Sequence, residues 1–565
     1  MYYTEVQFLS ASLEADFLKR ISDLAERRMK ERGGVVCSNK PETYQITFEY
    51  EMSMQNDGYR ISDTQQGVCI ASNSKCGLIA GFGRFLRDGT IHPERGFQPG
   101  RFRGEETPEK PFRGMYYATH FHNFYNDAPI PEIHKIIEDS ALWGQNVLCF
   151  WYDFHHYESI DDPESVKMIA RLKDFMRFAK GLGLQTLMLT LSNEMFMNSP
   201  EDVRAEWEAQ GDYFRTPHGH YHLEVCPSKQ GGVEAICRDR EQFLKAFADA
   251  EPDYYLLWPY DQGGCTCSDC APWGANGFLQ VANALRPLIE KYFPETKICL
   301  SGWYFDKFIR GEWDAFYKEM QSGDYRDWVK YIVTFFTEGG KIPSFIRNDQ
   351  NIAGIPILDF PEISMYGATP WGGFGSNATP NMFMDIWDRT KSFTHGGLPY
   401  SEGIYEDINK VTMFSIYFGR LKSGEDIVRE YVRFEFSPDL EEEITEMIML
   451  QEETIMRAWA RIENPPAGKP NYKIVLNHPY VVDYIYECAK RIDTKLDPIT
   501  KRSWRWRILY LRAAVDYELM TNDYYVLSQC EEYLNELTEI YYAQNADFVV
   551  APPTPKAVAA DRGIV

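Results

Sequence analysis

From residue 112 onward, short apolar runs alternate eight times with segments of helical periodicity. A strand followed by a helix, repeated eight times, is the rhythm of a closed parallel barrel and not of an open sheet. The expected strands cover residues 114–119, 146–152, 186–191, 254–258, 298–303, 331–336, 355–358 and 397–400. The sequence therefore predicts an α/β fold centred on a (β/α)8 TIM barrel.

The chain has 565 residues, which is too long for a single hydrophobic core, so further domains are expected on both sides of the barrel. Residues 1–108 predict a small N-terminal α/β domain, because two helical stretches are interleaved with short alternating strands. The barrel is placed at 109–410, after a linker rich in proline and glycine. Residues 411–565 predict a helical C-terminal domain, in which one amphipathic helix is expected at 440–461.

The net charge of −24 argues against a nucleic-acid partner or an anionic membrane surface, since Lys and Arg supply the attraction to phosphate. No apolar run approaches the roughly 20 residues that span a bilayer, and the first residues do not resemble a signal peptide. We therefore expect a cytoplasmic protein. The oligomeric state is left open, a homo-oligomer included. Aromatic residues make up 15% of the chain, which favours a carbohydrate partner because their flat faces stack on sugar rings.

Asp261 is the first candidate for catalysis, because it comes just after the apolar run that ends at Trp258. Barrel enzymes place their chemistry at the carboxyl-terminal ends of the strands. The apolar neighbours of Asp261 predict a raised pKa, which suits a general acid or the group that orients one. Its alternative role is to cap the turn at Gly263 and Gly264.

Four further acids follow predicted strands, and the working pair of a glycosidase is expected among them and Asp261. Glu338 and Glu402 each precede a glycine, which lets the backbone turn and leaves the acid facing the mouth. Glu194 follows Asn193, and we expect this pair to be sugar-binding or catalytic. Glu362 follows Phe360-Pro361. A solvated loop acid is the alternative for Glu338 and Glu402. Asp359 and Glu362 straddle Phe360-Pro361, so one of them is expected to point into the mouth and the other into a structural contact. Glu406 and Asp407 fall at an expected helix start, where capping is the simpler role.

Aromatic and polar side chains at the same strand ends are predicted to bind the substrate. Tryptophans can stack on sugar faces, although each of them could equally pack in the core. A histidine just past a strand is as well explained by packing or capping. The predicted substrate-binding residues are His120, Asp153, Asn193, Trp258, Tyr260, Trp303 and Trp371.

Cys265, Cys267 and Cys270 follow the pattern C-x-C-x-x-C, which suits thiolate ligation of zinc. Cys226 is the predicted fourth ligand, since the loop before it can return toward the fourth strand; Cys237 and a histidine between 218 and 222 are alternatives. Reduced thiols without metal and a disulfide also remain open. Four thiolates would close the site to water, so zinc there would be structural and would brace the segment carrying Asp261.

Residues 57–61, 67–72 and 77–87 resemble the small domain that precedes the barrel in family 20 β-hexosaminidases and family 67 α-glucuronidases. Residues 226–229, 258–267 and 400–410 look more like a branch of the same superfamily related to the family 163 endo-β-N-acetylglucosaminidases. Family 20 enzymes carry an adjacent Asp-Glu pair after the fourth strand, whereas Asp261 is followed here by Gln262. The resemblance therefore implies the fold more strongly than it implies the substrate.

These observations predict a glycoside hydrolase that cleaves a hexosaminide or uronide with two carboxylates at the barrel mouth. Two other classes stay open. One is a carbohydrate-binding or regulatory protein on a barrel that has lost its catalytic pair, as the missing Asp-Glu motif would allow. The other is a metal-dependent hydrolase that uses the cysteine cluster, which closed thiolate sites make less favourable.

Overall fold

The fold is described here from a computed structural model of the chain. The structure describes residues 1–33, 35–37, 43–120, 123–205, 223–259, 264–307, 309–336, 342–364, 375–455, 457–469, 472–476 and 478–542. None of the helices in these segments is both long and apolar enough to cross a lipid bilayer.

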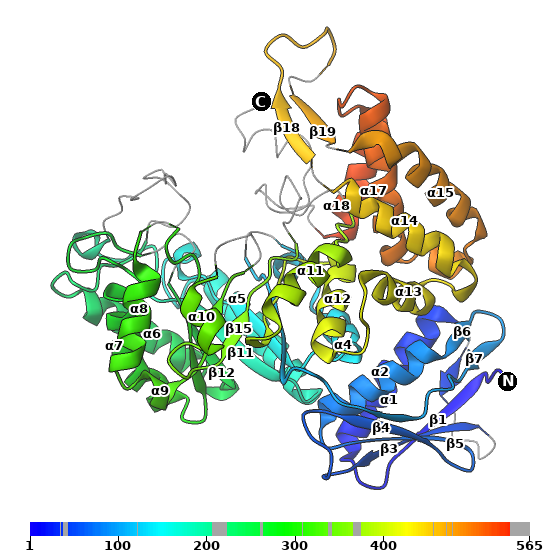
Figure 1. The fold of residues 1–565 in the computed structure, drawn as a ribbon, viewed down its shortest axis with the longest axis horizontal. Coiled ribbons are helices and arrows are strands. Elements are labelled where there is room, and N and C mark those ends of the chain that lie inside the picture. The colour runs from blue at the N-terminus through cyan, green and yellow to red at the C-terminus, as the bar shows by residue number, and fades with distance from the viewer. Residues whose placement is uncertain are drawn as a thin grey trace.

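The middle of the chain forms a closed barrel of parallel strands, as the alternation in the sequence predicts, and the barrel lies on the left in Figure 1. The barrel closes because β9 pairs with β10 on one side and with β16 and β17 on the other. Its strands are buried on both faces, which is why they read as continuous apolar runs. They are β9 (Phe112–Tyr117), β10 (Val147–Trp151), β11 (Gln185–Leu191), β12 (Tyr254–Trp258), β13 (Lys297–Ser301), β14 (Val329–Thr334), β15 (Ile357–Asp359), β16 (Thr394–Gly397) and β17 (Tyr400–Ser401).

Helices between the strands cover the outside of the barrel. Their buried faces carry the regular apolar spacing of amphipathic helices. They are α3 (Phe124–Asp127), α4 (Ile130–Leu142), α5 (Pro163–Gly181), α6 (Gly232–Ala246), α7 (Gly277–Tyr292), α8 (Glu312–Ser322), α9 (Tyr325–Trp328), α10 (Ser344–Asp349), α11 (Pro380–Thr390) and α12 (Asp407–Phe418).

The N-terminal part is a six-stranded mixed sheet in the order β2-β1-β3-β5-β4-β8, with the helices α1 (Ala15–Arg32) and α2 (Lys75–Asp88). The first strand, β1, lies between β2 and β3 in this sheet and was not predicted from the sequence. The strands are β1 (Glu5–Leu9), β2 (Val36–Cys37), β3 (Tyr44–Tyr50), β4 (Tyr59–Asp63), β5 (Gly67–Ser72) and β8 (Gly104–Glu106), with a hairpin of β6 (Thr90–His92) and β7 (Gly96–Gln98) beside them.

The C-terminal part is mainly helical, as predicted, and lies against both the barrel and the N-terminal part (Figure 1). The predicted helix at 440–461 is wrong beyond residue 453. Residues 457–461 instead pair antiparallel with 472–476, because prolines at 465 and 466 stop a helix and a partner strand follows at once. The elements are α13 (Gly424–Glu435), α14 (Glu441–Glu453), β18 (Arg457–Arg461), β19 (Tyr472–Leu476), α15 (Val482–Lys495), α16 (Pro498–Lys501), α17 (Trp504–Thr521) and α18 (Ser528–Ile540).

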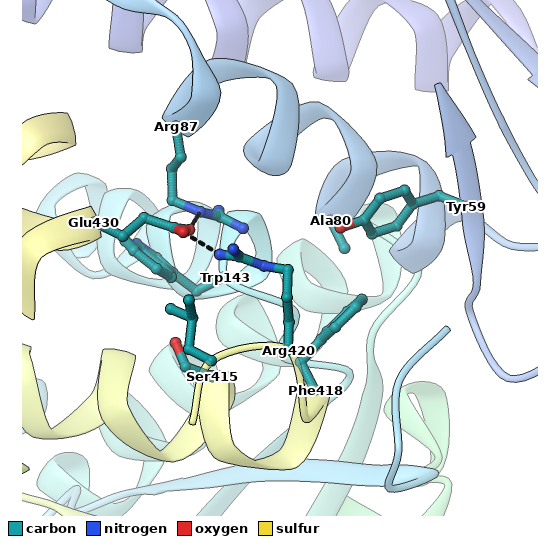
Figure 2. A pocket seen from close by; sticks show the side chains of 9 residues that line it. Tyr59, Ala80, Arg87, Trp143, Ser415, Phe418, Arg420 and Glu430 are labelled. Atoms are coloured by element: carbon teal, nitrogen blue, oxygen red, sulfur yellow. Dashed lines mark hydrogen bonds and ion pairs between the residues drawn. The ribbon is translucent and has the colours of Figure 1, made fainter. Parts of the chain in front are cut away.

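Buried ion pairs join the three parts. In one contact, Arg87 of α2 donates to Glu430 of α13 at 2.7 Å (Figure 2). Arg87 also donates to the Leu142 carbonyl of α4 at 2.6 Å. Arg420 also pairs with Glu430, and the Arg87 guanidinium lies 4.1 Å from the centroid of the Trp143 ring. These contacts join the N-terminal part to both the barrel and the C-terminal part.

A second and larger network surrounds Arg505 of α17. Its guanidinium contacts Asp139 of α4 at 2.7 Å and Asp407 of α12 at 2.9 Å, and it lies 3.7 Å from Glu435 of α13. Arg28 of α1 pairs with the same Glu435 at 2.6 Å. All five side chains are buried, so each charge depends on its partners for stabilisation.

Candidate active site

Three of the predicted acids follow barrel strands at the carboxyl-terminal end of the barrel. Glu194 follows the third strand, β11; Glu362 follows the seventh, β15; and Glu402 follows β17 at the eighth position. Because Glu194 and Glu362 are four strands apart in a ring of eight, they approach the mouth from opposite sides. This is the arrangement that two carboxylates need in order to act on one bond from two faces.

Glu194 is buried and held by the turn after β10. Its Oε1 atom lies 2.5 Å from Nδ1 of His155 and accepts the backbone N–H of His155 at 3.2 Å. Its Oε2 atom is buried and has no hydrogen-bond partner among the described residues. One oxygen is therefore held by hydrogen bonds, and the other has no hydrogen-bond partner in that part of the chain.

Burial raises the pKa of Glu194 well above its usual range, and the nearby Asp153 carboxylate adds to the shift. Asp153 itself contacts Nδ1 of His156 at 2.6 Å. Burial opposes the charge on His156, but Asp153 outweighs it and raises the pKa of His156. Burial, with the neighbouring His156 and His155, lowers the pKa of His120 well below its usual range. Burial therefore favours the uncharged form of both Glu194 and His120.

Glu402 lies in a turn that is fixed from several directions. The Tyr400 hydroxyl donates to its Oε1 atom at 3.0 Å. Its backbone carbonyl accepts the N–H of Phe124 at 3.0 Å and the hydroxyl of Tyr541, from the end of the C-terminal helix α18, at 2.6 Å. Gly403 is needed next to it, because a Cβ there would lie 2.5 Å from Phe124 and 2.7 Å from the Tyr541 ring.

Glu406 and Asp407 do not cap α12, so the capping role expected for them is wrong. Glu406 instead accepts the Ser401 hydroxyl and the Gly403 N–H, both at 2.7 Å, and so closes the turn that carries Glu402. Asp407 belongs to the network around Arg505. Both acids accept hydrogen bonds from donors outside the first turn of α12, which sequence spacing cannot reveal.

Glu362 lies beside Tyr400 through a parallel bridge between the two backbones. Its Oε1 atom accepts the backbone N–H and the hydroxyl of Ser364, at 2.7 and 2.8 Å. Residues paired across parallel strands point to the same side of the sheet, so Glu362, Tyr400 and Glu402 share one side of the mouth.

Asp359 points differently from Glu362, as expected for two acids that straddle Phe360 and Pro361. Its carboxylate accepts the Phe360 N–H at 2.8 Å and is attracted to Arg389 of α11. Burial and the charge of Asp359 raise the pKa of Tyr417 in α12. Asp359 therefore faces the outer helices. Burial raises the pKa of Asp359 to about 7.

Asp359→Asn is expected to stabilise the protein in a pH-dependent way. The folded-state pKa of Asp359, about 7, lies above the ordinary aspartate pKa of 3.8, so its contribution to stability is present below pH 4 and lost as pH rises to 7. At about 1.4 kcal/mol per pKa unit, the variant should gain at most about 4 kcal/mol over the wild type across this range, and nothing further above it. Urea titrations between pH 4 and 8 would measure the difference. A difference that does not change with pH would contradict the assignment.

Aromatic side chains from several strand ends pack together at the carboxyl-terminal end of the barrel. Trp258 and Trp303 both pack on Phe360, with ring centroids 4.8 and 5.1 Å away. Tyr116 stacks on Tyr400 at 5.2 Å. His120, close by, packs edge-on against Trp151 at 4.8 Å. The rings predicted to stack on sugar thus lie at one end of the barrel, although Trp258 and Trp303 are only 4% and 8% exposed.

Among the described residues, the side chain of Asn193 hydrogen-bonds only to backbone groups. Its amide nitrogen donates to the carbonyls of Val225 and Gly264, at 3.0 and 3.2 Å. It is fully buried. Asn193 therefore ties the chain before Cys226 to the chain before Cys265, and sugar binding by this residue stays a prediction.

The four predicted metal ligands lie next to these hydrogen bonds of Asn193. The sulfur atoms of Cys226, Cys265, Cys267 and Cys270 all lie within 4.8 Å of one another. Burial and the neighbouring Cys265 sulfur raise the pKa of Cys226 to about 11, so four thiolates would not coexist there without a cation. Cys237, the alternative fourth ligand, is in α6, and its sulfur lies 3.9 Å from the Ala284 carbonyl.

The remaining predicted site residues lie outside the described residues. They are Asp261, Glu338, Tyr260 and Trp371. Tyr541 and Tyr400 were missed by sequence reasoning. Tyr400 could have been found from its place at a strand end, whereas nothing in the sequence connects Tyr541 with Glu402, which is 139 residues away.

The barrel with acids at its mouth is the fold of a large class of glycoside hydrolases, as the resemblance in the sequence implies. No protein-family model matches the sequence, and no curated protein is significantly similar to it. Solved structures match along most of the chain. A family 115 4-O-methyl-α-glucuronidase with specificity for decorated arabinogalactans has a TM-score of 0.58 at 11% identity, over 98% of this chain and 78% of that chain.

Two other solved structures give similar scores. A family 89 enzyme from Clostridium perfringens, in complex with GlcNAc-α-1,4-galactose, has a TM-score of 0.59 at 13% identity, over 93% of this chain and 64% of that chain. A family 138 enzyme that targets pectin rhamnogalacturonan II has a TM-score of 0.56 at 9% identity, over 95% of this chain and 72% of that chain. At these identities the likeness establishes the fold.

Proposed function

We propose that the protein is a glycoside hydrolase that cleaves a hexosaminide or a uronide at the barrel mouth. The observation that supports the proposal is the strand order: Glu194 follows the third strand, Glu362 follows the seventh and Glu402 lies at the eighth position, with aromatic side chains packed at the same end of the barrel. Glycosidic cleavage needs one carboxylic acid to protonate the leaving oxygen and a second group on the other face. The carbohydrate ligands and substrates in the descriptions of the structural neighbours support the same class.

The two sides of the mouth suit different roles. Glu194 is the proposed general acid, because burial and Asp153 raise its pKa and so keep its proton near neutral pH. Glu402 and Glu362 are the proposed nucleophile or base and its neighbour, since both carboxylates accept hydrogen bonds from fixed donors. Asp261 and Glu338 remain candidates for the same roles on the strength of their positions in the sequence.

The test is turnover of a panel of glycosides. Aryl α- and β-glycosides of N-acetylglucosamine, N-acetylgalactosamine and glucuronic acid, together with matching oligosaccharides, should include at least one substrate. Amide variants of Asp261, Glu194, Glu338, Glu362 and Glu402 should each be assayed on it. At least two should lose about 100-fold or more in kcat/KM, the lower end of the effect of removing an acid or base.

Asp359→Asn is the matched control, because it changes an acid at the same strand end that faces the outer helices. It should keep kcat/KM within a few-fold of the wild type. Sugar binding without turnover across the panel, or full activity in all five amide variants, would contradict the proposal and favour a binding protein.

A further inference from the structure

The four cysteines have the geometry of a tetrahedral metal site. A zinc ion with four sulfur ligands at about 2.3 Å places its sulfurs about 3.8 Å apart. Cys226 lies 3.7 Å from both Cys267 and Cys270, measured between sulfur atoms. Both separations are far beyond a covalent S–S bond of about 2.0 Å.

The surroundings of the sulfurs also suit thiolates. The backbone N–H of Ser228 donates to the Cys226 sulfur, and the Ser228 hydroxyl lies 3.2 Å from the Cys270 sulfur. Such hydrogen bonds from the outer shell stabilise charged metal ligands. Cys226, Cys265 and Cys270 are fully buried, while Cys267 is partly exposed and offers an entry path for the ion.

We propose that Cys226, Cys265, Cys267 and Cys270 hold a structural zinc ion that clips together two loops of the barrel mouth. Cys226 belongs to the connection between β11 and α6, and the other three belong to the connection between β12 and α7. Four thiolates complete the coordination of zinc and leave no position for water or substrate. The ion would therefore shape the mouth without taking part in the reaction, and it is independent of the function proposed above.

The proposed zinc ion is expected to help hold both ends of the segment that carries Asp261. On one side of that segment, the Pro259 carbonyl accepts the indole N–H of Trp273 at 2.9 Å. Trp273 comes three residues after Cys270. On the other side, Asn193 holds Gly264, which directly precedes Cys265. Both anchors depend on where the cysteine cluster lies, so loss of the ion is expected to loosen both ends of the segment.

Metal analysis of the full chain, purified without added zinc and without a metal-affinity tag, tests the proposal. About one equivalent of zinc per chain is expected, with X-ray absorption showing four sulfur neighbours at about 2.3 Å. Cys226→Ser should lose at least tenfold in bound zinc. Cys237→Ala is the matched control, because Cys237 lies nearby in α6 and is not among the four ligands; it should keep the full equivalent.

If Cys226→Ser does not fold, cobalt(II) substitution of the wild type gives a second measurement, since its visible absorption distinguishes four sulfur ligands from mixed sets. Less than about a tenth of an equivalent of zinc, both as purified and after incubation with zinc, would overturn the proposal. Iron in place of zinc, or a disulfide among the four cysteines found by mass spectrometry, would overturn it as well. Zinc retained in Cys226→Ser and lost in Cys237→Ala would overturn the ligand set.

Discussion

Glu194→Gln is expected to lower kcat/KM about 10²- to 10⁴-fold for a substrate whose leaving group is another sugar. A sugar hydroxyl is a poor leaving group and must be protonated as the bond breaks, and glutamine has no proton to give. The loss should be much smaller for an aryl glycoside whose phenol is strongly acidic, because that leaving group needs little protonation. Steady-state assays on both kinds of substrate measure the two losses.

The pH profile gives an independent readout of the same role. Burial and Asp153 raise the pKa of Glu194, and a general acid works only while protonated. Wild-type kcat/KM should therefore fall as pH rises through this pKa, and Glu194→Gln should lack that limb. Glu234→Gln, the same chemical change on the exposed face of α6, should alter neither the rate nor the profile. Equal losses for every leaving group would show that Glu194 has a structural role only.

Arg505→Met is expected to destabilise the folded protein by about 3–5 kcal/mol, because it leaves buried carboxylates without their cation. Asp407 is affected most, because Arg505 is the cation that pairs with it, at 2.9 Å. The Tyr431 hydroxyl, which also donates to Asp407 at 2.8 Å, carries no charge. Asp139 and Glu435 keep the guanidinium of Arg28. Methionine roughly preserves the volume, so the loss reports charge more than packing.

Arg507→Met is the matched control, two residues along the same helix. Arg507 pairs with Glu536 at 2.7 Å, but their side chains are 23% and 39% exposed, so the loss should be about 0–1 kcal/mol. The double variant Arg505→Met with Asp407→Asn should recover part of the stability, since it removes the stranded charge. Urea titrations followed by tryptophan fluorescence compare the four proteins. Equal losses for Arg505→Met and Arg507→Met would contradict the role of the network.

The barrel could be predicted from the sequence because its strands are buried on both faces and so read as apolar runs. The rise in the pKa of Glu194 could not be predicted, since it depends on how deeply the folded chain buries this side chain and on Asp153, from the end of a neighbouring strand. The hairpin of β18 and β19 was missed because two short strands gain their stability from pairing with each other. Cys226 could be placed near the other cysteines because the connection that contains it returns to the adjacent strand, β12.

The hydrogen bond from Tyr541 to the Glu402 carbonyl has a consequence for synthesis on the ribosome. A nascent chain that has emerged as far as β17 already contains every strand of the barrel. It still lacks the donor that fixes the turn at Glu402, which arrives 139 residues later. Domains fold as they emerge, so the barrel can close early. Catalytic competence is then expected to be among the last properties that the growing chain acquires.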